Sequence, residues 1–243
     1  MEISEGRLRA LVREVDEAHR AGMTTIAGDI AELHAGEGRR TMGATRRRVL
    51  RGLGLGGISI AIGSTVLPWN ALLDPAWADQ AADDKALAKF AESVELAAVA
   101  AYQAAAASGK ITAAAVLSAA QTFASHHHDH AAAFGGLAGD AATAKPNPLV
   151  LAAVTGQIKA APDQNGVLGV ALDLENGAAA TYLFALGALA DVSALKLTAS
   201  ILPVESQHAV VLATAVGKQL KDLVPTFQTA DAKIDPAKFP PAS

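Results

Sequence analysis

Two stretches of the sequence carry side chains of types that can bind metal ions, and these side chains follow a similar pattern of spacing in both stretches. Each begins with a glutamate, has a tyrosine seven residues later, and ends in two metal-ligating residues spaced i, i+3. In order, these residues are Glu95, Tyr102, His127 and His130 in the first stretch, and Glu175, Tyr182, Glu205 and His208 in the second. Positions i, i+3 and i, i+7 share one face of a helix, so each stretch predicts one helix with a carboxylate followed by one helix with two ligands.

The composition of the chain beyond Asp79 favours the same placement. This part has four glutamates and five histidines, and all of them except Glu92 lie in the two stretches. Carboxylates and imidazoles bind iron, manganese, zinc and copper. Ionised glutamates in an apolar core need a metal ion or protons to compensate their charge. The sequence therefore predicts a transition-metal site in the core.

Composition also bounds the fold and excludes several kinds of site. Hydrophobic residues make up 51% of the 243 residues and aromatic residues only 4%, and no strand-like alternation is present, which favours an all-α domain. The chain has no cysteine, so disulfides and thiolate metal sites are excluded. From Asp79 onward, 15 acidic residues and 10 lysines give a net charge of −5, so no nucleic-acid partner is expected.

Four long helices are expected, and their connections define the topology. They are predicted over residues 83–108, 112–134, 165–190 and 193–223. The second is expected to begin at the cap Thr112 and to stop at Gly135 and Gly136. A short loop joins the helices of each hairpin, whereas residues 137–163 form a long connection with a short helix near 149–159. Two antiparallel hairpins joined by a long crossover are a known four-helix-bundle topology.

The chain resembles the ferritin-like superfamily, in particular the bacterial exported ferritin-like domain proteins. The segment Phe90-Ala-Glu-Ser-Val-Glu-Leu-Ala-Ala-Val-Ala-Ala-Tyr102 is similar to the first helix of that family, and Val204-Glu-Ser-Gln-His-Ala209 to its fourth. The resemblance covers residues 83–223 and implies a ferritin-like four-helix bundle. It also implies a dinuclear metal centre, with one Glu from each of two helices and Glu-x-x-His from each of the other two.

The resemblance implies a ligand for this centre at each of six positions, and one of them departs from the family pattern. The implied metal ligands are Glu95, His127, His130, Glu175, Glu205 and His208. His127 stands where the family has a glutamate. Three carboxylates hold two ferric ions less well than four, so a mononuclear site, or one with zinc, manganese or copper, competes with the di-iron centre that the family implies.

Several residues near the site keep two interpretations. Residues 126–130 either direct two or three side chains towards the core as ligands or form a solvated histidine cluster; His128 and Asp129 are expected to face solvent. Glu92 is expected on the surface, one turn before Glu95. The two tyrosines either hydrogen-bond to the site or relay electrons, or they pack in the core with a buried hydroxyl.

The N-terminal third predicts export. Residues 1–40 are predicted to form a charged amphipathic segment, because Leu8, Leu11, Val12 and Val15 lie at helical spacing. Residues 1–41 are interpreted as a leader extension or as sequence upstream of the true start at Met42, and a short partner-binding helix is the alternative. Thr45-Arg-Arg-Arg-Val-Leu-Arg51 resembles a twin-arginine signal, and uncharged residues 52–73 and Ala76-Trp-Ala78 complete a signal peptide over 42–78. Cleavage would leave a bundle over 79–223 and a proline-containing tail over 224–243. The alternative is a membrane anchor, since 22 uncharged residues just span a bilayer.

These features predict an exported, metal-binding ferritin-like protein in the periplasm, on the cell surface or secreted. The resemblance implies an oxidase of ferrous iron or a scavenger of peroxide. The alternative is a non-catalytic extracytoplasmic bundle, structural or stress-associated, with a degenerate site. The expected partners are metal ions, the twin-arginine export machinery and further copies of the chain in a homo-oligomer.

Overall fold

The structure is a computed structural model that describes residues 3–35, 84–189, 191–218 and 233–241. These residues form α-helices and one short 3-10 helix, and none of them lies in a strand, so the expected all-α fold class is confirmed. The elements are α1 (Glu5–Ala35), α4 (Asp84–Ala107), α5 (Ala114–Ala138), η2 (Gly139–Ala141), α6 (Pro148–Ala160), α7 (Gln164–Ala188) and α8 (Val192–Ala215).

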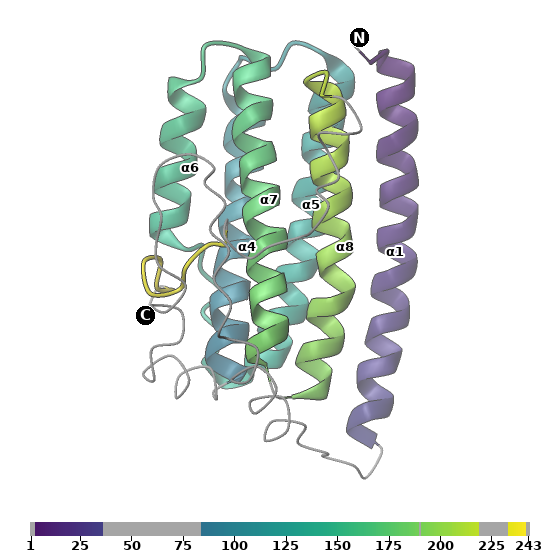
Figure 1. The fold of residues 1–243 in the computed structure, drawn as a ribbon, viewed down its shortest axis with the longest axis vertical. Coiled ribbons are helices and arrows are strands. Elements are labelled where there is room, and N and C mark those ends of the chain that lie inside the picture. Colours follow the sequence, from purple (N-terminus) through teal and green to yellow (C-terminus); the bar gives the residue numbers. More distant parts are fainter. Residues whose placement is uncertain (1–2, 36–83, 190, 219–232, 242–243) are drawn as a thin grey trace, which may run out of the picture.

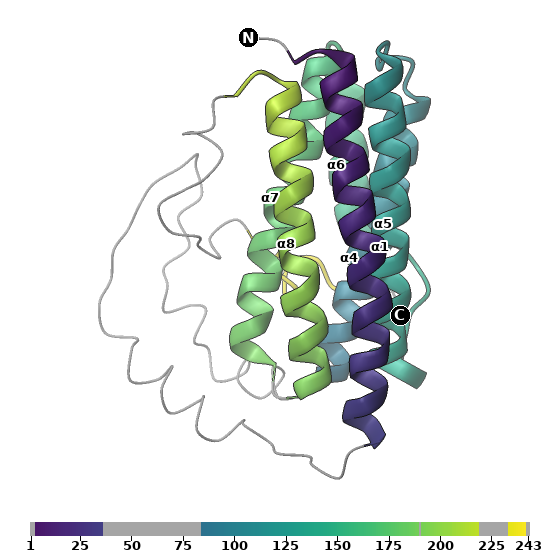
Figure 2. The ribbon, with the colours of Figure 1, turned by 90° about the vertical axis from the view of Figure 1, so that its right-hand side faces the viewer.

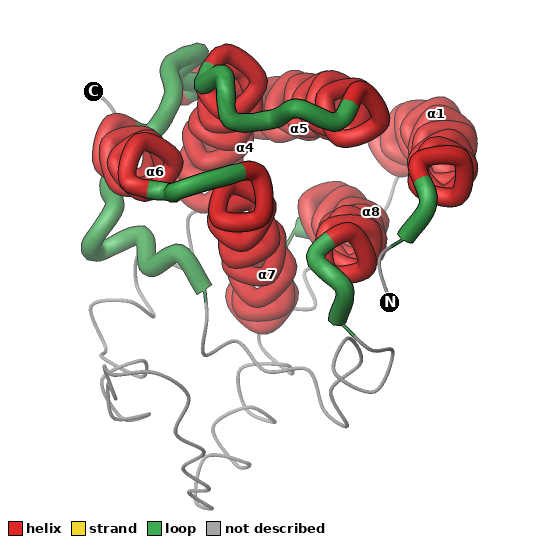
Figure 3. Tube along the Cα trace, turned by 90° about the horizontal axis from the view of Figure 1, so that it is seen from above, coloured by secondary structure: helices red, strands yellow, loops and turns green. Residues whose placement is uncertain are grey.

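Four of the helices form the expected bundle. α4 packs antiparallel to α5, and α7 packs antiparallel to α8 (Figures 1 and 3). Residues 139–163 cross from one hairpin to the other, and they contain η2 and α6. α6 packs against α4 and α7 on the outside of the bundle, so the short helix expected in the crossover is present.

Capping residues explain where α6, α7 and α8 begin. The carboxylate of Asp163 accepts a hydrogen bond from the backbone of Gly166, and Asp191 accepts from Ser193 and Ala194, so both residues cap a helix N-terminus. Asn147 caps α6 in the same way, and Pro148 follows it at a position where the missing N–H costs nothing.

The predicted boundaries of α5 are wrong at both ends. Thr112 does not cap the helix; instead, the side chain of Gln164 accepts hydrogen bonds from the backbone N–H groups of Thr112 and Ala113. The helix also continues through Gly135 and ends only at Gly139, whose φ of 57° suits glycine. Gly135 is a packing position, because a Cβ there would lie 3.1 Å from Oε1 of Glu92.

The C-terminal part of the second hairpin is shorter than expected. α8 ends at Ala215, and Gly217 follows with a φ of 78° that favours glycine. Pro203 lies inside α8, and it leaves the carbonyl one turn earlier without its helical donor. The described C-terminal segment, 233–241, lies against the bundle: Ile234 N–H donates to Thr181, and Asn147 donates to the carbonyl of Phe239.

α1 is a fifth long helix that packs against α5 and α8 (Figure 2). Leu8, Val12 and Val15 recur at helical spacing, and all three are buried in the same core cluster as residues of α5 and α8. The interpretation of residues 1–41 as a leader did not predict this contact with the bundle.

The predicted signal peptide, residues 42–78, lies outside the described residues. Among the helices that the structure does describe, none combines the length and the apolar character that a membrane crossing requires.

Candidate metal centre

The six ligands predicted from the sequence lie together in the bundle, and we call them the inner cluster. They are Glu95 on α4, His127 and His130 on α5, Glu175 on α7, and Glu205 and His208 on α8. Each is at most 1% exposed. Their donor atoms form two groups, each with all atoms within 4.8 Å of one another, and His127 and Glu205 belong to both groups. The structure therefore brings the six together, and their binding of a metal stays a prediction.

His127 lies between the two glutamates that come from different hairpins. Its Nδ1 is 2.7 Å from Oε2 of Glu95, and its Nε2 is 3.1 Å from Oε1 of Glu175. One imidazole thus contacts both carboxylates at the position where the family pattern has a glutamate. Sequence reasoning expected His127 at this departure, and the structure shows that its ring faces the core.

Glu205 and His130 are buried and in contact through their charged groups, but they form no hydrogen bond. Nδ1 of His130 lies 2.9 Å from Oε1 of Glu205. Even so, neither carboxylate oxygen of Glu205 and neither ring nitrogen of His130 forms a hydrogen bond with any described residue. A buried polar group without a partner costs about 1–3 kcal/mol, and more when it is charged. A metal ion at this position would satisfy these atoms, so the residues present fit one.

The two tyrosines hold the glutamates across the bundle. Tyr102 on α4 donates a hydrogen bond to Glu175 on α7, and Tyr182 on α7 donates to Glu95 on α4. Each tyrosine therefore contacts the glutamate of the opposite hairpin rather than the one seven residues before it. Of the interpretations that the sequence left open, hydrogen bonding to the site is the one that the structure supports.

Charge pairing dominates the electrostatics of the inner cluster. Burial opposes the imidazolium of His130, but Glu95 and Glu205 outweigh burial and raise its pKa to about 9. The same balance raises the pKa of His127 well above its ordinary value, with Glu175 the strongest neighbour, and also raises that of His208. Burial favours the neutral carboxyls, yet the histidines lower the pKa of Glu95 and, further, that of Glu175. Without a metal, imidazolium groups balance the carboxylates.

Two more histidines and two aspartates form a second layer towards α1, which we call the outer histidine group. Its members are Asp16 and His19 on α1, and His126 and Asp129 on α5. Nε2 of His126 is 3.1 Å from Oδ1 of Asp16, and Nε2 of His19 is 3.3 Å from Oδ2 of Asp129. The rings of His19 and His126 stack with centroids 3.9 Å apart.

The histidines of the outer group behave oppositely to those of the inner cluster. Burial, and then the neighbouring His130, lower the pKa of His19 to about 4. Burial and then His208 lower the pKa of His126 further below its ordinary value. Both imidazoles are therefore neutral at physiological pH. The two layers touch directly, because Nδ1 of His126 lies 2.9 Å from Nε2 of His208.

Sequence reasoning missed Asp16 and His19, although a signal for them exists. They have the same i, i+3 spacing as the ligand pairs, and they follow Val12 and Val15 on a helix with a clear apolar face. Interpreting residues 1–41 as a leader removed them from consideration. His126, for which a solvated position was an alternative, is buried, whereas His128 is exposed as expected.

The expected surface position of Glu92 is wrong. It is 5% exposed, and its carboxylate accepts hydrogen bonds from the backbone N–H groups of Thr143 and Ala144 in the crossover. It also packs against Gly135. Glu92 therefore fixes the crossover to the first hairpin and lies outside both groups of metal-ligating atoms.

A cavity of about 190 Å³ lies between α1 and α8 and reaches the inner cluster at His130. Its walls include His19, Gly22 and Met23 from α1, and Ile201 and Gln207 from α8. Nδ1 of His19 and both ring nitrogens of His130 are buried and form no hydrogen bond with a described residue. The cavity is large enough for a few water molecules or one small reactant.

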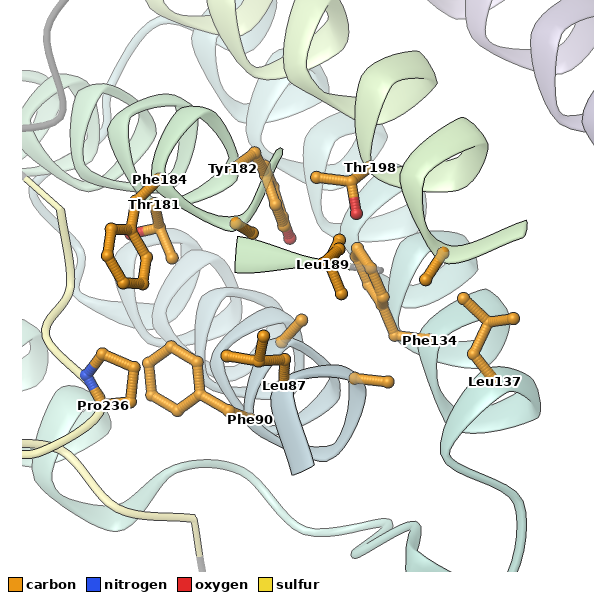
Figure 4. Close-up of a pocket in the computed structure, with 14 residues that line it drawn as sticks. Leu87, Phe90, Phe134, Leu137, Thr181, Tyr182, Phe184, Leu189, Thr198 and Pro236 are labelled. Atoms are coloured by element: carbon orange, nitrogen blue, oxygen red, sulfur yellow. The ribbon is translucent and has the colours of Figure 1, made fainter. Parts of the chain in front are cut away.

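A much smaller pocket of about 20 Å³ lies beside Tyr182 (Figure 4). Leu87, Phe90 and Phe134 are among the side chains around it, and Figure 4 shows an almost entirely apolar lining. Its volume suits about one water molecule, so it holds no substrate.

Comparison with known proteins gives one match. Residues 83–218 match the profile of the ferritin-like domain family, which is more than half of the chain and spans α4 to α8. Neither a curated protein nor a solved structure matches the chain at a significant level.

Proposed function

The chain belongs to the ferritin-like domain family, and from this premise we propose that it binds one or two transition-metal ions in the inner cluster. The observation that carries the proposal is Glu205, whose two carboxylate oxygens are fully buried and have no hydrogen-bond partner among the described residues. The imidazoles of His130 and His208 lie 2.9 and 3.6 Å from these oxygens without hydrogen-bonding to them, and a metal ion would satisfy both oxygens at once.

The ligand set favours iron and its neighbours in the first transition row. Three carboxylates and three imidazoles give a borderline set that suits iron, manganese, zinc and copper. The family resemblance makes iron the leading occupant. His127 replaces one negative ligand with a neutral one, which favours one tightly held ion or two unlike ions over two ferric ions.

The activity that fits this site is oxidation of ferrous iron or removal of peroxide. A bound transition metal would supply the electron transfer that carboxylates and imidazoles cannot supply themselves. The protein's own residues exclude bulk water, and Tyr102 and Tyr182 orient the two glutamates. The cavity between α1 and α8 would admit ferrous ions or a small oxidant towards His130.

One observation favours a second candidate, a non-catalytic structural bundle with a degenerate site. His127 contacts both Glu95 and Glu175, and its raised pKa makes it an internal cation between them. Together with His130 and His208, it can neutralise the cluster without any metal. In that case the cluster would serve only to join the two hairpins.

We also propose export by the twin-arginine pathway, on the strength of Thr45–Arg51 and the Ala76–Ala78 cleavage site. The expected destination is the periplasm, the cell surface or the medium. Changing Arg46→Lys together with Arg47→Lys should hold the protein in the cytoplasm. Export of the double variant, cut after Ala78, would contradict this route.

Elemental analysis of the protein purified from its own host, without added metal or chelator, tests the function. We expect one or two transition-metal ions per chain. Rapid mixing of metal-free protein with ferrous iron and either dioxygen or peroxide then tests the activity. Metal-free protein that neither takes up iron nor consumes an oxidant would support the structural bundle instead.

A further inference from the structure

A chain of hydrogen bonds runs from α1 to a predicted metal ligand. Oδ1 of Asp16 is 3.1 Å from Nε2 of His126, and Nδ1 of His126 is 2.9 Å from Nε2 of His208. The other nitrogen of His208, Nδ1, faces the inner cluster, 3.3 Å from Oε2 of Glu175 and 3.6 Å from Oε2 of Glu205. The chain thus connects the outer histidine group with the inner cluster.

The direction of each hydrogen bond follows from the first partner. A carboxylate can only accept, so the hydrogen of neutral His126 lies on Nε2, facing Asp16. Nδ1 of His126 is then an acceptor, and Nε2 of His208 must supply the hydrogen between the two rings. Nε2 of His208 is therefore occupied, and Nδ1, 3.3 Å from Oε2 of Glu175, is the nitrogen that a metal ion would bind after displacing its proton.

The surroundings hold these groups in place. Asp16 pairs through both oxygens with Arg20, at 3.0 and 2.6 Å. His126 stacks on His19, which Asp129 holds in turn. Phe123 stacks on the ring of His208 with centroids 4.1 Å apart. Neither imidazole can turn over without breaking a hydrogen bond in the core.

We infer that α1 completes the metal centre: Asp16 and His126 are positioning residues that make Nδ1 of His208 the metal-binding nitrogen. The inference rests on the proposed function, because it requires His208 to bind a metal. It gives α1 a role beyond the leader that the sequence predicted. Cleavage after Ala78, which accompanies the export that we propose, would remove α1, so α1 acts on the metal centre in the full-length protein before export.

The test uses full-length protein and Zn²⁺, which is diamagnetic. Long-range ¹H–¹⁵N spectra of the Zn²⁺-loaded protein identify which nitrogen of His208 binds the metal, and the expected result is Nδ1. Asp16→Ala should lower the affinity for Zn²⁺ about 10-fold or more, as loss of a partner behind a ligating histidine usually does. Asp16→Asn keeps an acceptor oxygen and should restore most of the affinity.

Controls separate positioning from simple folding effects. Glu17→Ala removes an exposed acid from the next position of α1 and should leave Zn²⁺ affinity unchanged. His126→Phe keeps a ring of similar shape but removes both hydrogen bonds, so it should match Asp16→Ala even if that variant loosens α1.

Two results overturn different claims. If wild type binds no Zn²⁺, the proposed function fails. If wild type binds Zn²⁺ through Nε2 of His208, or if Asp16→Ala and His126→Phe bind as tightly as Glu17→Ala, only the role of α1 fails.

Discussion

The inner cluster and the outer histidine group combine the same two chemical groups, carboxylate and imidazole, with opposite effects on the histidines. In the inner cluster the glutamates are buried with the imidazoles, and the pKa of His130 rises to about 9. In the outer group the aspartates reach the surface, with side chains 23% and 48% exposed for Asp16 and Asp129, and the pKa of His19 falls to about 4. A buried carboxylate makes its imidazole a cation, whereas a partly solvated one only orients a neutral ring.

The largest effect should come from removing one inner carboxylate. Glu205→Gln keeps the shape of the side chain but removes the charge of a carboxylate that belongs to both groups of donor atoms. Since loss of an outer partner already costs 10–100-fold, we expect metal affinity to fall by at least about 100-fold. Titration of the metal-free protein with Fe²⁺ or Zn²⁺ measures this.

Glu92→Gln is the matched control, because Glu92 is also a buried glutamate but bonds to the crossover backbone. It should bind metal as wild type does and lose only stability. Equal affinities for Glu205→Gln and Glu92→Gln would mean that the inner cluster is not the binding site.

The next effect concerns the charge of the inner cluster. His127→Glu restores the family pattern and places a fourth carboxylate beside Glu95 and Glu175. The metal-free variant should be less stable than wild type, because an internal cation becomes an anion. With iron present, we expect the number of bound ions per chain to rise to two and ferrous oxidation to be faster. Unchanged stoichiometry would show that His127 does not limit the site.

The inner cluster and the outer histidine group should also affect the stability of the metal-free protein in different pH ranges. The pKa of His130 is about 9 when folded and 6.5 in the reference state, so its pairing stabilises the fold fully below pH 6.5 and is lost as pH rises through 9. The pKa of His19 is lowered to about 4 in the folded protein, so His19 takes up a proton more readily when the protein is unfolded. The free energy of unfolding therefore falls as pH drops from 6.5 towards 4. Each change amounts to at most about 3 kcal/mol.

Urea unfolding between pH 4 and 9.5 checks this, with His19→Phe as the distinguishing variant. That substitution should reduce the loss of stability at acid pH and leave the alkaline loss intact. If His19→Phe instead changes the loss of stability at alkaline pH, the inner cluster and the outer histidine group do not titrate separately.

The smallest effect should come from narrowing the cavity between α1 and α8. Gly22 lines that cavity, and a Cβ added there meets no atom within 4 Å, so Gly22→Leu should fold and fill part of the space. The rate of metal uptake, measured by rapid mixing, should fall, and the equilibrium affinity for the metal should stay unchanged. Gly28→Leu is the control on the same helix, since Gly28 is exposed and does not line the cavity. Equal slowing in both variants would exclude the cavity as the route by which metal enters.

The sequence was most informative where function imposes a spacing. The repeat of a glutamate followed by an i, i+3 pair located all six residues that the structure brings together, because helical periodicity converts sequence distance into a shared face. Prediction from the sequence failed where the role of a residue depends on a partner that is distant in the chain. Gly135 resembles a helix terminator until Glu92 packs against it, and Glu92 resembles a surface acid until the crossover covers it.

For the same reason, the sequence did not predict that α1 packs against the bundle. Its apolar positions predicted an amphipathic helix, but nothing local to the first 41 residues shows which surface that helix covers. Only the packing of α1 on α5 places Asp16 beside His126. The pairing therefore became visible in three dimensions, although its i, i+3 spacing with His19 was present in the sequence.

Anomalous X-ray diffraction from crystals of the full-length protein, grown without added metal and recorded at the iron and zinc edges, tests the central claim most directly. We predict at least one anomalous peak among the inner cluster, bound by Glu205 and by Nδ1 of His208. Crystals with no peak, in which the ring of His127 still joins Glu95 to Glu175, would contradict the claim and establish the cluster as a metal-free link between the two hairpins.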